Sequence, residues 1–343
     1  MRVVRLVSKE QIRVEEAPDP TLQHDTDAIV RVTHSAICGA DLLPYHGRTP
    51  GFEDGTILGH EFVGEVVDVG DQVHQVAVGQ RVVNTSMTSD GTCAHCRANR
   101  ATQCESRSLF GYSGVYPRLE GGQADFVRVP QAHRSLWAVP DNVSNEDAVF
   151  VADILPTALA GVQRGGVANG DLVVVVGCGP VGLMAVIAAI GVAREVIAVD
   201  GIVERCELAE RLGARAVSPE DAAEAVLAAS GGLGADVVVE AAGALPALNA
   251  TFGLVRAQGA ISVIGAHFEP DYPLNNAVMF EKELTLTFSI GNPGRDRERL
   301  FAAIQSGAMR PSTVLTHQLS IDDAAEAYRA FDAREMTKVV LLT

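Results

Sequence analysis

Three of the chain's six cysteines gather in one short segment, which is the first sign of metal chemistry. Cys93, Cys96 and Cys104 lie within a dozen residues of one another, whereas the other three cysteines stand apart. The first residues show no charged segment followed by an apolar one, so we expect no secretion signal. In such a chain, clustered thiols favour a metal site over disulfide bonds.

A glycine pattern near the middle of the chain predicts a nucleotide site between the apolar runs 172–176 and 183–190. The segment reads Gly177, Cys178, Gly179, Pro180, Val181 and Gly182. In a turn that joins a strand to a helix, the first glycine turns the chain and the second admits a pyrophosphate close to the backbone. The third lets the helix pack on the strand, so that the helix N-terminus faces the anion.

Asp200 indicates which dinucleotide this site would prefer. It ends the next apolar run, 23 residues beyond Gly177. From there a carboxylate can accept hydrogen bonds from both hydroxyls of the adenosine ribose, whereas it would repel a 2'-phosphate. We therefore expect NAD rather than NADP. Two alternatives stay open: Asp200 could only cap the next helix, and the nearby Arg205 could suit a 2'-phosphate.

The elements that must position these groups change in character near residue 150. Before it, short β-branched runs separated by Gly and Pro predict an all-β unit. Its expected strands include Ala28–Val32, Phe62–Val69, Gln80–Asn84 and Ala124–Val129. After it, strands alternate with helices, which predicts a parallel sheet covered on both faces and an α/β fold class.

The expected elements of this second part follow in regular order. The strands are Leu172–Val176, Val196–Val199, Ala216–Val217, Asp236–Val239, Ala260–Ile264 and Leu284–Ser289. The helices are Leu183–Ile190, Val203–Leu212, Ala222–Ala229 and Ala247–Val255. A tail from about Arg295 holds two amphipathic helical runs and a last strand, Lys338–Leu342.

The composition excludes several classes of partner. Lys and Arg total 27 against 43 Asp and Glu, a formal net charge of −16. Nucleic acids and anionic membranes need clustered positive charge, so we expect neither. The uncharged stretch Val173–Ala193 has the length of a membrane helix, but its glycines and proline fit a strand, a turn and a helix better. We expect a cytoplasmic protein.

Two segments of the first part closely resemble the zinc alcohol dehydrogenase signature of the medium-chain dehydrogenase/reductase superfamily. They are Cys38–Asp41 and Gly59–Gly64, the latter followed by Gly70. The resemblance extends over essentially the whole chain. It implies a GroES-like β-rich catalytic domain over residues 1–154, completed by 291–343, and a doubly wound Rossmann domain over 155–290. It also implies a homodimer or homotetramer.

The resemblance implies a catalytic zinc. Cys38 and His60 supply two ligands, and the third falls at the start of the segment that links the domains, where we assign Asp153. Three protein ligands leave the fourth position open for substrate. Glu61 resembles a nearby acid that binds the zinc transiently. Taken singly, Cys38 could be a packing residue and His60 an ordinary hydrogen-bonded one.

The family's structural zinc site is matched at three of its four positions. Relatives have four cysteines at the spacing of Asp90, Cys93, Cys96 and Cys104. An aspartate oxygen can ligate zinc, and four protein ligands leave no room for substrate. We therefore expect a structural zinc, with a cluster that has lost its metal as the alternative.

Two further residues correspond to positions that relatives use for the cofactor. Thr157 matches a hydroxyl that lies against the nicotinamide ring. Lys338 matches a basic residue that reaches the pyrophosphate, and an ordinary solvated lysine is the alternative.

The resemblance fails at Ala40, where relatives carry the Ser or Thr that starts the proton relay. His46 is one candidate replacement because its pKa suits the task, although it could be a surface histidine. Tyr45 and a water held by Asp41 or Glu61 are others.

Three functions stay open. The favoured one interconverts an alcohol or polyol with its aldehyde or ketone: zinc acts as a Lewis acid and the nicotinamide exchanges the hydride. The second reduces a C=C or C=N bond with zinc retained for shape, and the third binds NAD without catalysis. Aromatic and apolar loop residues could line the substrate pocket or anchor loops; they are Tyr45, Phe52, Leu109, Phe110, Tyr112 and Tyr116.

Overall fold

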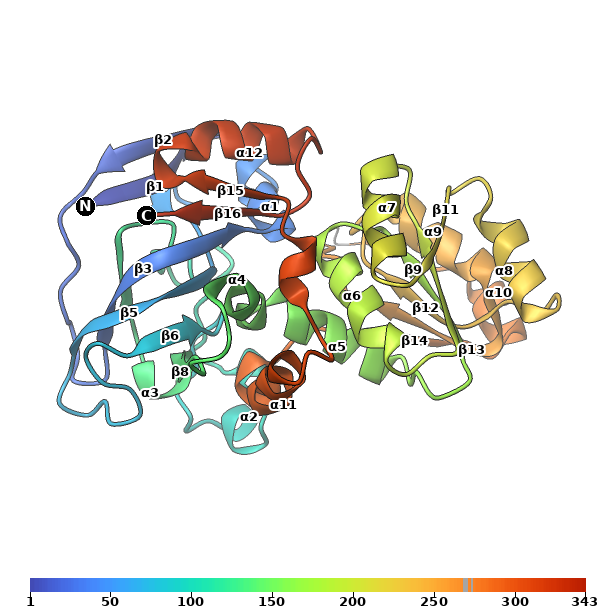
Figure 1. Cartoon of the computed structure of the whole chain (residues 1–343), viewed down its shortest axis with the longest axis horizontal. Coiled ribbons are helices and arrows are strands. Elements are labelled where there is room, and N and C mark those ends of the chain that lie inside the picture. The colour runs from blue at the N-terminus through green and yellow to red at the C-terminus, as the bar shows by residue number, and fades with distance from the viewer. Residues whose placement is uncertain (268–270, 273) are drawn as a thin grey trace. The chain divides into compact units, whose positions relative to one another are not determined.

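The computed structural model describes residues 1–267, 271–272 and 274–343. The chain divides into two compact units, which Figure 1 shows in ribbon form. The first comprises Met1–Asp153 and Asn292–Thr343, and the second comprises Ile154–Gly291. Each boundary lies one residue from the position that the sequence suggests.

The first unit is built around a mostly antiparallel sheet of seven strands. Six of them follow in the order β15, β16, β3, β5, β6 and β8, and β7 pairs with β3. Their bounds are β3 Ala28–Ile37, β5 Glu61–Val69, β6 Arg81–Asn84, β7 Phe126–Val129, β8 Leu136–Ala138, β15 His317–Ser320 and β16 Val339–Leu342. A smaller sheet, in the order β2, β1 and β4, comprises β1 Arg2–Ser8, β2 Gln11–Glu16 and β4 Thr56–Ile57.

The helices of the first unit are mostly single turns between strands. The α-helices are α1 Leu42–Tyr45, α2 Ala94–Arg97, α3 Ala132–Ser135, α4 Asn145–Ala148, α11 Pro293–Gln305 and α12 Ala324–Asp332. The 3-10 turns are η1 Gly39–Asp41, η2 Ala101–Gln103, η3 Val149–Ala152, η4 Pro311–Val314 and η5 Ile321–Asp323. Many short loops therefore present the sequence's polar and sulfur-bearing residues at the sheet's margins.

The core of the first unit follows from alternation along its strands. Side chains at every second position point to one face of a strand, so Val30 and Val32 of β3 are buried with Val66 of β5. Phe62 and Phe110 close this core edge to face, with ring centroids 5.3 Å apart. The residues just beyond these strands are thereby held on a rigid base.

The second unit contains a six-stranded parallel sheet in the order β11, β10, β9, β12, β13 and β14. The strands are β9 Leu172–Val176, β10 Glu195–Val199, β11 Arg215–Val217, β12 Ala235–Glu240, β13 Val255–Val263 and β14 Thr285–Phe288. This strand order is that of a doubly wound Rossmann sheet. The predicted combination of a β-rich domain with a parallel sheet is confirmed.

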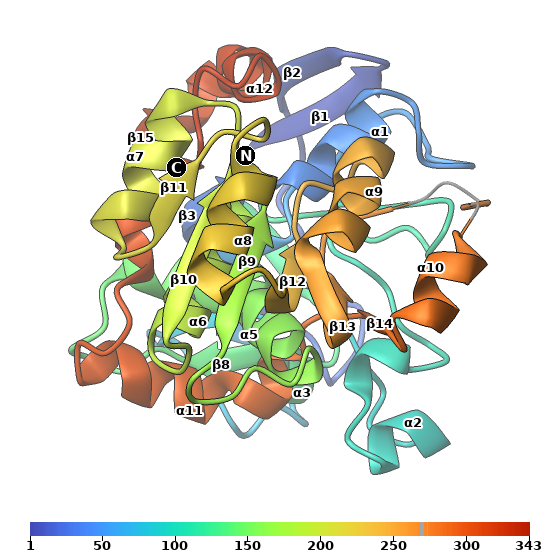
Figure 2. The same ribbon diagram turned by 90° about the vertical axis from the view of Figure 1, so that its right-hand side faces the viewer.

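Helices cover both faces of this parallel sheet, which Figure 2 brings toward the viewer. They are α5 Ile154–Arg164, α6 Pro180–Ile190, α7 Val203–Arg211, α8 Ala222–Ser230, α9 Leu245–Leu254 and α10 Asn276–Glu281. All five residues of β9 are buried, as the central strand of a covered parallel sheet should be. The uncharged stretch Val173–Ala193 is thus a buried strand, a turn and a helix.

The structure differs from the expected elements mainly at their ends. A helix was expected to run to Val255, but α9 ends at Leu254 and the strand β13 starts at Val255, five residues before the expected Ala260. Val255 is β-branched and buried, so it adopts a strand conformation paired with β12 instead of continuing the helix. Ala124 lies outside β7 and bridges Val3 alone.

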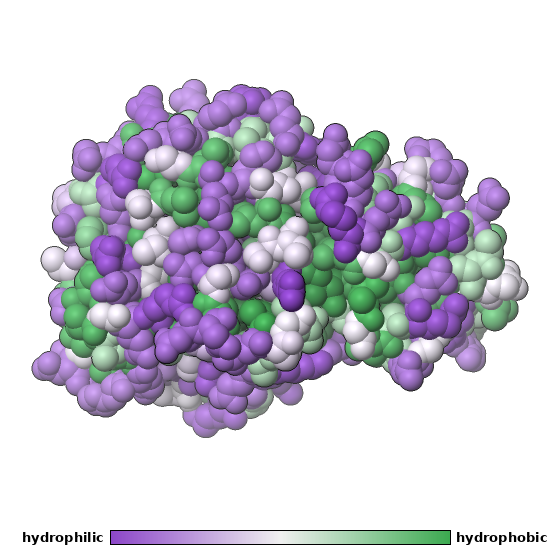
Figure 3. Space-filling view, viewed as in Figure 1, coloured by the Kyte–Doolittle hydropathy of each residue, from purple (hydrophilic) through white to green (hydrophobic). Residues whose placement is uncertain are grey.

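None of the described helices is long and apolar enough to cross a membrane. On the face drawn in Figure 3, hydrophilic side chains predominate over the first unit, with apolar ones scattered among them.

Candidate metal centres and nucleotide site

Cys38, His60, Glu61 and Asp153 converge in the first unit. One ligand atom from each lies within 4.8 Å of the others. Cys38 directly follows β3 and His60 directly precedes β5. These two strands are antiparallel neighbours with Ala36 opposite Glu61, so the end of one meets the start of the other. Asp153 follows the 3-10 turn η3, which contacts both strands.

His60 is held so that each ring nitrogen faces a carboxylate. Its Nε2 lies 3.5 Å from Oδ2 of Asp153, and its Nδ1 lies 3.1 Å from Oδ1 of Asp41. The Nδ2 group of Asn84 donates to the His60 carbonyl at 2.8 Å and fixes its backbone. A carboxylate behind the imidazole is the usual partner that orients a metal-bound histidine. Sequence reasoning considered Asp41 only as a holder of water and missed this role.

The charges around His60 indicate what the cluster lacks. Burial alone would lower the pKa of His60, but Asp41, Cys38 and Asp153 together raise it well above its usual value. Burial raises the pKa of the Cys38 thiol, which therefore needs a nearby cation to become a thiolate. Such a pocket of anions around a ring nitrogen is complementary to a divalent cation.

The hydrogen-bond inventory of the cluster is also incomplete. Within the described part of the chain, no hydrogen-bond partner is found for three buried atoms: Oδ1 of Asp41, Nδ1 of His60 and Oε1 of Glu61. The first two are close enough for an ion pair but are not aligned as a hydrogen bond. Sulfur, nitrogen and oxygen donors at these separations fit zinc, with Cys38, His60 and Asp153 as ligands and Glu61 beside them.

The sequence suggested that Lys338 contacts the cofactor, but the structure gives its ammonium group other partners. It is fully buried, and its ammonium group donates to Oε2 of Glu61 and, at 3.1 Å, to the carbonyl of Ile37. Burial would lower the pKa of Lys338, but Glu61 and Cys38 raise it, so the amine stays charged. The alternative that Lys338 is an ordinary solvated lysine is therefore wrong. In this structure its ammonium group binds Glu61.

Ser86 lies beside the cluster and was missed from the sequence. Its hydroxyl donates to Oδ1 of Asp153 at 3.0 Å. Because Asp153 turns its other oxygen to His60, Ser86 fixes the orientation of the carboxylate. No motif in the sequence marks this serine. Only its contact with Asp153 in the folded chain reveals it.

Ala40 and Tyr112 form the wall next to the cluster. The phenol of Tyr112 donates to the Ala40 carbonyl, and its ring lies edge to face with His60 at 6.4 Å. Phe52 packs on the Tyr112 ring at 6.1 Å. Of the aromatic loop residues singled out from the sequence, Tyr112 thus lies against His60, and Phe52 lies behind Tyr112.

His46 does not lie where the suggested proton relay would need it. It follows α1, where its Nδ1 lies 3.1 Å from Glu10 and its Nε2 lies 2.7 Å from Asp332. Within the described part of the chain, no contact joins it to Cys38 or His60. Both ring nitrogens are occupied by carboxylates, so His46 ties α1 to α12 instead.

The second cluster brings Asp90, Cys93, Cys96 and Cys104 together, with one ligand atom of each within 4.8 Å of the others. Backbone N–H groups donate to the sulfurs, from Cys96 to Cys93 and from Asp90 to Cys104, each at 3.4 Å. The N–H of Cys96 helps to lower the pKa of Cys93, whereas burial raises that of Cys96 to about 12. The donor set suits a closed, four-coordinate zinc.

Asp90 is prepared to act as the fourth ligand. Its Oδ1 accepts the N–H groups of Thr92 at 2.7 Å and Cys93 at 3.1 Å, and its Oδ2 accepts the Ser106 hydroxyl. These hydrogen bonds hold the pKa of Asp90 well below its usual value. The carboxylate is therefore ionised and fixed toward the thiols.

The glycine turn lies between β9 and α6 in the second unit. Gly177 has φ of 93°, which disfavours any residue with a side chain. A Cβ at Gly182 would lie 1.8 Å from the Gly177 carbonyl, so strand and helix could not approach each other. Among the described residues, apart from the chain neighbours of Gly179, only Arg205 comes within 4 Å of a Cβ placed on Gly179, which leaves space above the backbone for a ligand.

Asp200 stands at the end of β10 and faces this turn. Its Oδ2 accepts the N–H of Cys178 at 2.7 Å and its Oδ1 accepts that of Ile202 at 2.9 Å. Arg205 Nη1 lies 3.9 Å from Oδ2. Thus Asp200 joins the glycine turn to the start of α7. It binds the N–H at the start of that helix, as the capping alternative expects, and it also lies beside the glycine turn.

Thr157 lies on α5 and is buried. Its Oγ1 accepts the N–H of Gly291 at 3.1 Å, so it ties α5 to the end of the second unit. The predicted contact with a nicotinamide ring stays a prediction.

Comparisons with known proteins agree with this geometry. The model of the alcohol dehydrogenase GroES-like domain matches residues 24–141, and that of the zinc-binding dehydrogenase matches 180–306. A probable zinc-binding alcohol dehydrogenase of Mycobacterium tuberculosis is 35% identical over 335 residues, 97% of this chain and 86% of that protein. The structure of alcohol dehydrogenase TADH from Thermus sp. ATN1 has a TM-score of 0.94 and 37% identity, covering 100% of this chain and 99% of that one.

The chain belongs to the zinc-dependent alcohol dehydrogenase family of the medium-chain dehydrogenase/reductase superfamily, and it is an oxidoreductase. Two more distant structures carry different cofactors. A putative zinc-binding dehydrogenase of Sinorhizobium meliloti, 28% identical with a TM-score of 0.88, is bound to NADP and covers 100% of this chain and 99% of its own. The E. coli rspB dehydrogenase, 26% identical with a TM-score of 0.88 and the same coverage, is complexed with NADH.

Proposed function

We propose that the chain is a zinc-dependent, NAD-linked dehydrogenase that interconverts an alcohol or polyol with its aldehyde or ketone. The observation that carries the proposal is the convergence of Cys38, His60 and Asp153 around one point in the buried cluster. Two anionic donors and one neutral donor balance a divalent cation and leave one coordination position for substrate.

When bound there, zinc supplies a Lewis acid that makes an alcohol more acidic, and NAD supplies the hydride acceptor. The chain's own residues prepare the site for both. Asp41 orients the imidazole of His60, and Ser86 orients the carboxylate of Asp153. Lys338 neutralises Glu61, so the cluster does not carry one negative charge too many.

A proton must leave when an alcohol is oxidised, and Ala40 cannot take it. Ser86 supports the alcohol assignment because it places an exchangeable hydroxyl on Asp153, at 3.0 Å. We propose that Ser86 takes over the part that His46 was considered for.

The preference for NAD is supported by the carboxylate of Asp200 at the end of β10, beside the glycine turn. An anion there disfavours the 2'-phosphate of NADP. The guanidinium group of Arg205 lies 3.9 Å from that carboxylate, so its positive charge is directed toward Asp200. The second cluster holds a structural zinc in this proposal, through Asp90, Cys93, Cys96 and Cys104.

A homodimer or homotetramer in the cytoplasm completes the proposal. The edge strand β14 exposes 55% of Phe288, and 55% of Ile290 is exposed just beyond it, an apolar edge suited to a symmetric contact. All six cysteines are free thiols, as a reducing compartment maintains them.

The test combines metal analysis with NADH absorbance across a panel of alcohols and carbonyls. The proposal expects two zinc ions per chain and turnover that a chelator abolishes and zinc restores. Reduction of an activated C=C bond without any alcohol turnover would favour the second enzyme class. Binding of NADH without turnover of any substrate would remove the enzymatic proposal.

A further inference from the structure

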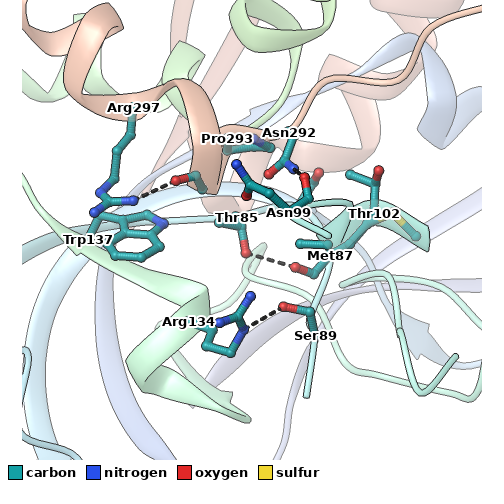
Figure 4. Close-up of a pocket in the computed structure, with 13 residues that line it drawn as sticks. Thr85, Met87, Ser89, Asn99, Thr102, Arg134, Trp137, Asn292, Pro293 and Arg297 are labelled. Atoms are coloured by element: carbon teal, nitrogen blue, oxygen red, sulfur yellow. Dashed lines mark hydrogen bonds between the residues drawn. The ribbon is translucent and has the colours of Figure 1, made fainter. Parts of the chain in front are cut away.

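A polar pocket in the first unit lies outside both metal clusters and is shown in Figure 4. It has a volume of about 180 Å³, which is room for roughly six water molecules at about 30 Å³ each. Its walls come from the loop after β6, the α2–η2 segment, α3, β8 and the start of α11. The lining residues used below are Ser86, Ser89, Arg134, Trp137, Asn292 and Arg297.

The pocket carries positive charge in a strongly acidic protein. Two arginines line it and no Asp or Glu does, although the chain's net charge is −16. Arg134 donates from Nε to the Ser89 hydroxyl at 3.0 Å, and no carboxylate among the described residues pairs with it. Arg297 pairs with Glu298 at 3.3 Å, whose side chain is 85% exposed, and its Nη1 donates to the Gly294 carbonyl at 2.5 Å. Such a pocket favours an anionic ligand.

Further donors converge on the same space. Arg297 stacks over the indole of Trp137 at 3.5 Å from the ring centroid, which presents its guanidinium edge-on and keeps it in place (Figure 4). Among the described residues, the Trp137 Nε1–H is buried without an acceptor. Asn292 caps α11, a helix of 13 residues whose N-terminal end carries a partial positive charge; its Oδ1 accepts the Arg295 N–H, and its Nδ2 donates to the Asn99 carbonyl. The Arg134 guanidinium and the Trp137 N–H are donors, so their natural partner is an acceptor.

We propose that this pocket binds a dianionic phosphate group, either inorganic phosphate or a small phosphate monoester. The planar fork of Arg134 matches two oxygens of a phosphate, and Ser89 adds a hydroxyl donor, whereas the Ser86 hydroxyl already donates to Asp153. The site is distinct from the pyrophosphate position at Gly177–Gly182, because all its residues belong to the first unit. It requires neither the zinc nor the nucleotide assignment.

The chain provides its own reporter, because Trp137 is its single tryptophan and lines the pocket. The experiment follows tryptophan fluorescence while sodium phosphate or methyl phosphate is added to the zinc-loaded protein at constant ionic strength. Sodium chloride serves as the blank. The proposal expects a saturable one-site change with phosphate and none with chloride. Saturation by methyl phosphate too would assign the site to the phosphate group in general, whereas saturation by inorganic phosphate alone would restrict it to the free ion.

Matched variants assign the signal to the pocket. Arg134→Gln should weaken phosphate binding about tenfold or more, because a charge-assisted fork is lost. Arg134→Lys, which keeps the charge but not the fork, should weaken it less. Arg211→Gln removes the same charge from an exposed arginine in the second unit and should bind like the parent chain.

Three outcomes would overturn the proposal. One is the absence of saturable change in the parent chain. Another is equal phosphate affinity in the Arg134→Gln and Arg211→Gln variants, as expected if phosphate binds zinc instead. If Arg134→Gln fails to fold, Arg297→Gln replaces it, and parent-like phosphate affinity in that variant would likewise reject the site.

Discussion

The two metal clusters of the first unit use similar donors but have opposite surroundings. The cluster of Cys38, His60 and Asp153 is largely buried, and neighbours hold its ligands from behind: Asp41 on the imidazole and Ser86 on the carboxylate. The cluster around Asp90 lies in a short surface segment, and its neighbours are the N–H groups of its own loop. In the proposed function, the first cluster binds the zinc that receives substrate, whereas the second holds a zinc that closes a loop.

The largest effect should come from removing a ligand of the buried cluster. Cys38→Ala should lower kcat/KM roughly a thousandfold, because a Lewis acid contributes several kcal/mol to transition-state stabilisation. Its thermal midpoint should change much less than its activity. Steady-state kinetics and a melting curve check this. An active Cys38→Ala chain would show that the buried cluster does not carry the catalysis.

The second cluster should respond in the opposite way. Cys93→Ala should lower the thermal midpoint by roughly 10 °C, because the metal-binding free energy is folding free energy for this loop. The remaining folded enzyme should keep kcat within a few-fold of the parent. Metal analysis should then give one zinc per chain instead of two. An unchanged midpoint and metal content would show that the cluster holds no ion in the parent.

The resemblance to the family pointed to Cys38, His60 and Asp153, and the structure brings these three side chains together. Their binding of zinc stays a prediction, and the sequence did not indicate which residues position them. Ser86 could not be found, since its contact with Asp153 joins residues 67 positions apart through η3. The contact of Lys338 with Glu61, 277 positions away, could not be found for the same reason.

The fold itself was more predictable than its boundaries. Valine runs and the glycine turn predicted β9 and α6, because burial on both faces excludes polar residues from a central strand. The start of β13 was missed by five residues, since Val255 joins the sheet only through pairing with Ala235. Short-range patterns determine what an element is, and long-range pairing decides where it begins.

Ser86→Ala changes a residue that orients Asp153 and that the proposed function also places in the proton relay. Residues that orient metal ligands typically contribute 10–100-fold in metal affinity or activity. We expect kcat/KM to fall within that range and zinc to dissociate faster. Ser106→Ala is the matched control, because Ser106 makes the equivalent contact to Asp90 of the other cluster. Equal activity in the two variants would contradict a role for Ser86 in catalysis.

The smallest effect concerns the second unit. Asp200→Ala should reduce the NAD preference over NADP by about 10–100-fold, since hydrogen bonds to a charged group contribute ~1.5–3 kcal/mol. The ratio of kcat/KM for the two cofactors measures this. Asp221→Ala, which removes an exposed acid near the start of α8, should leave the ratio unchanged. An unaltered ratio in Asp200→Ala would show that the carboxylate serves only the turn.

Anomalous diffraction at the zinc edge, from crystals of the zinc-loaded chain, would locate the metal ions. We expect a peak ~2.0–2.3 Å from Sγ of Cys38, Nε2 of His60 and a carboxylate oxygen of Asp153, with a fourth position open. Density at the Asp90 cluster alone, with no peak among these three residues, would contradict this expectation.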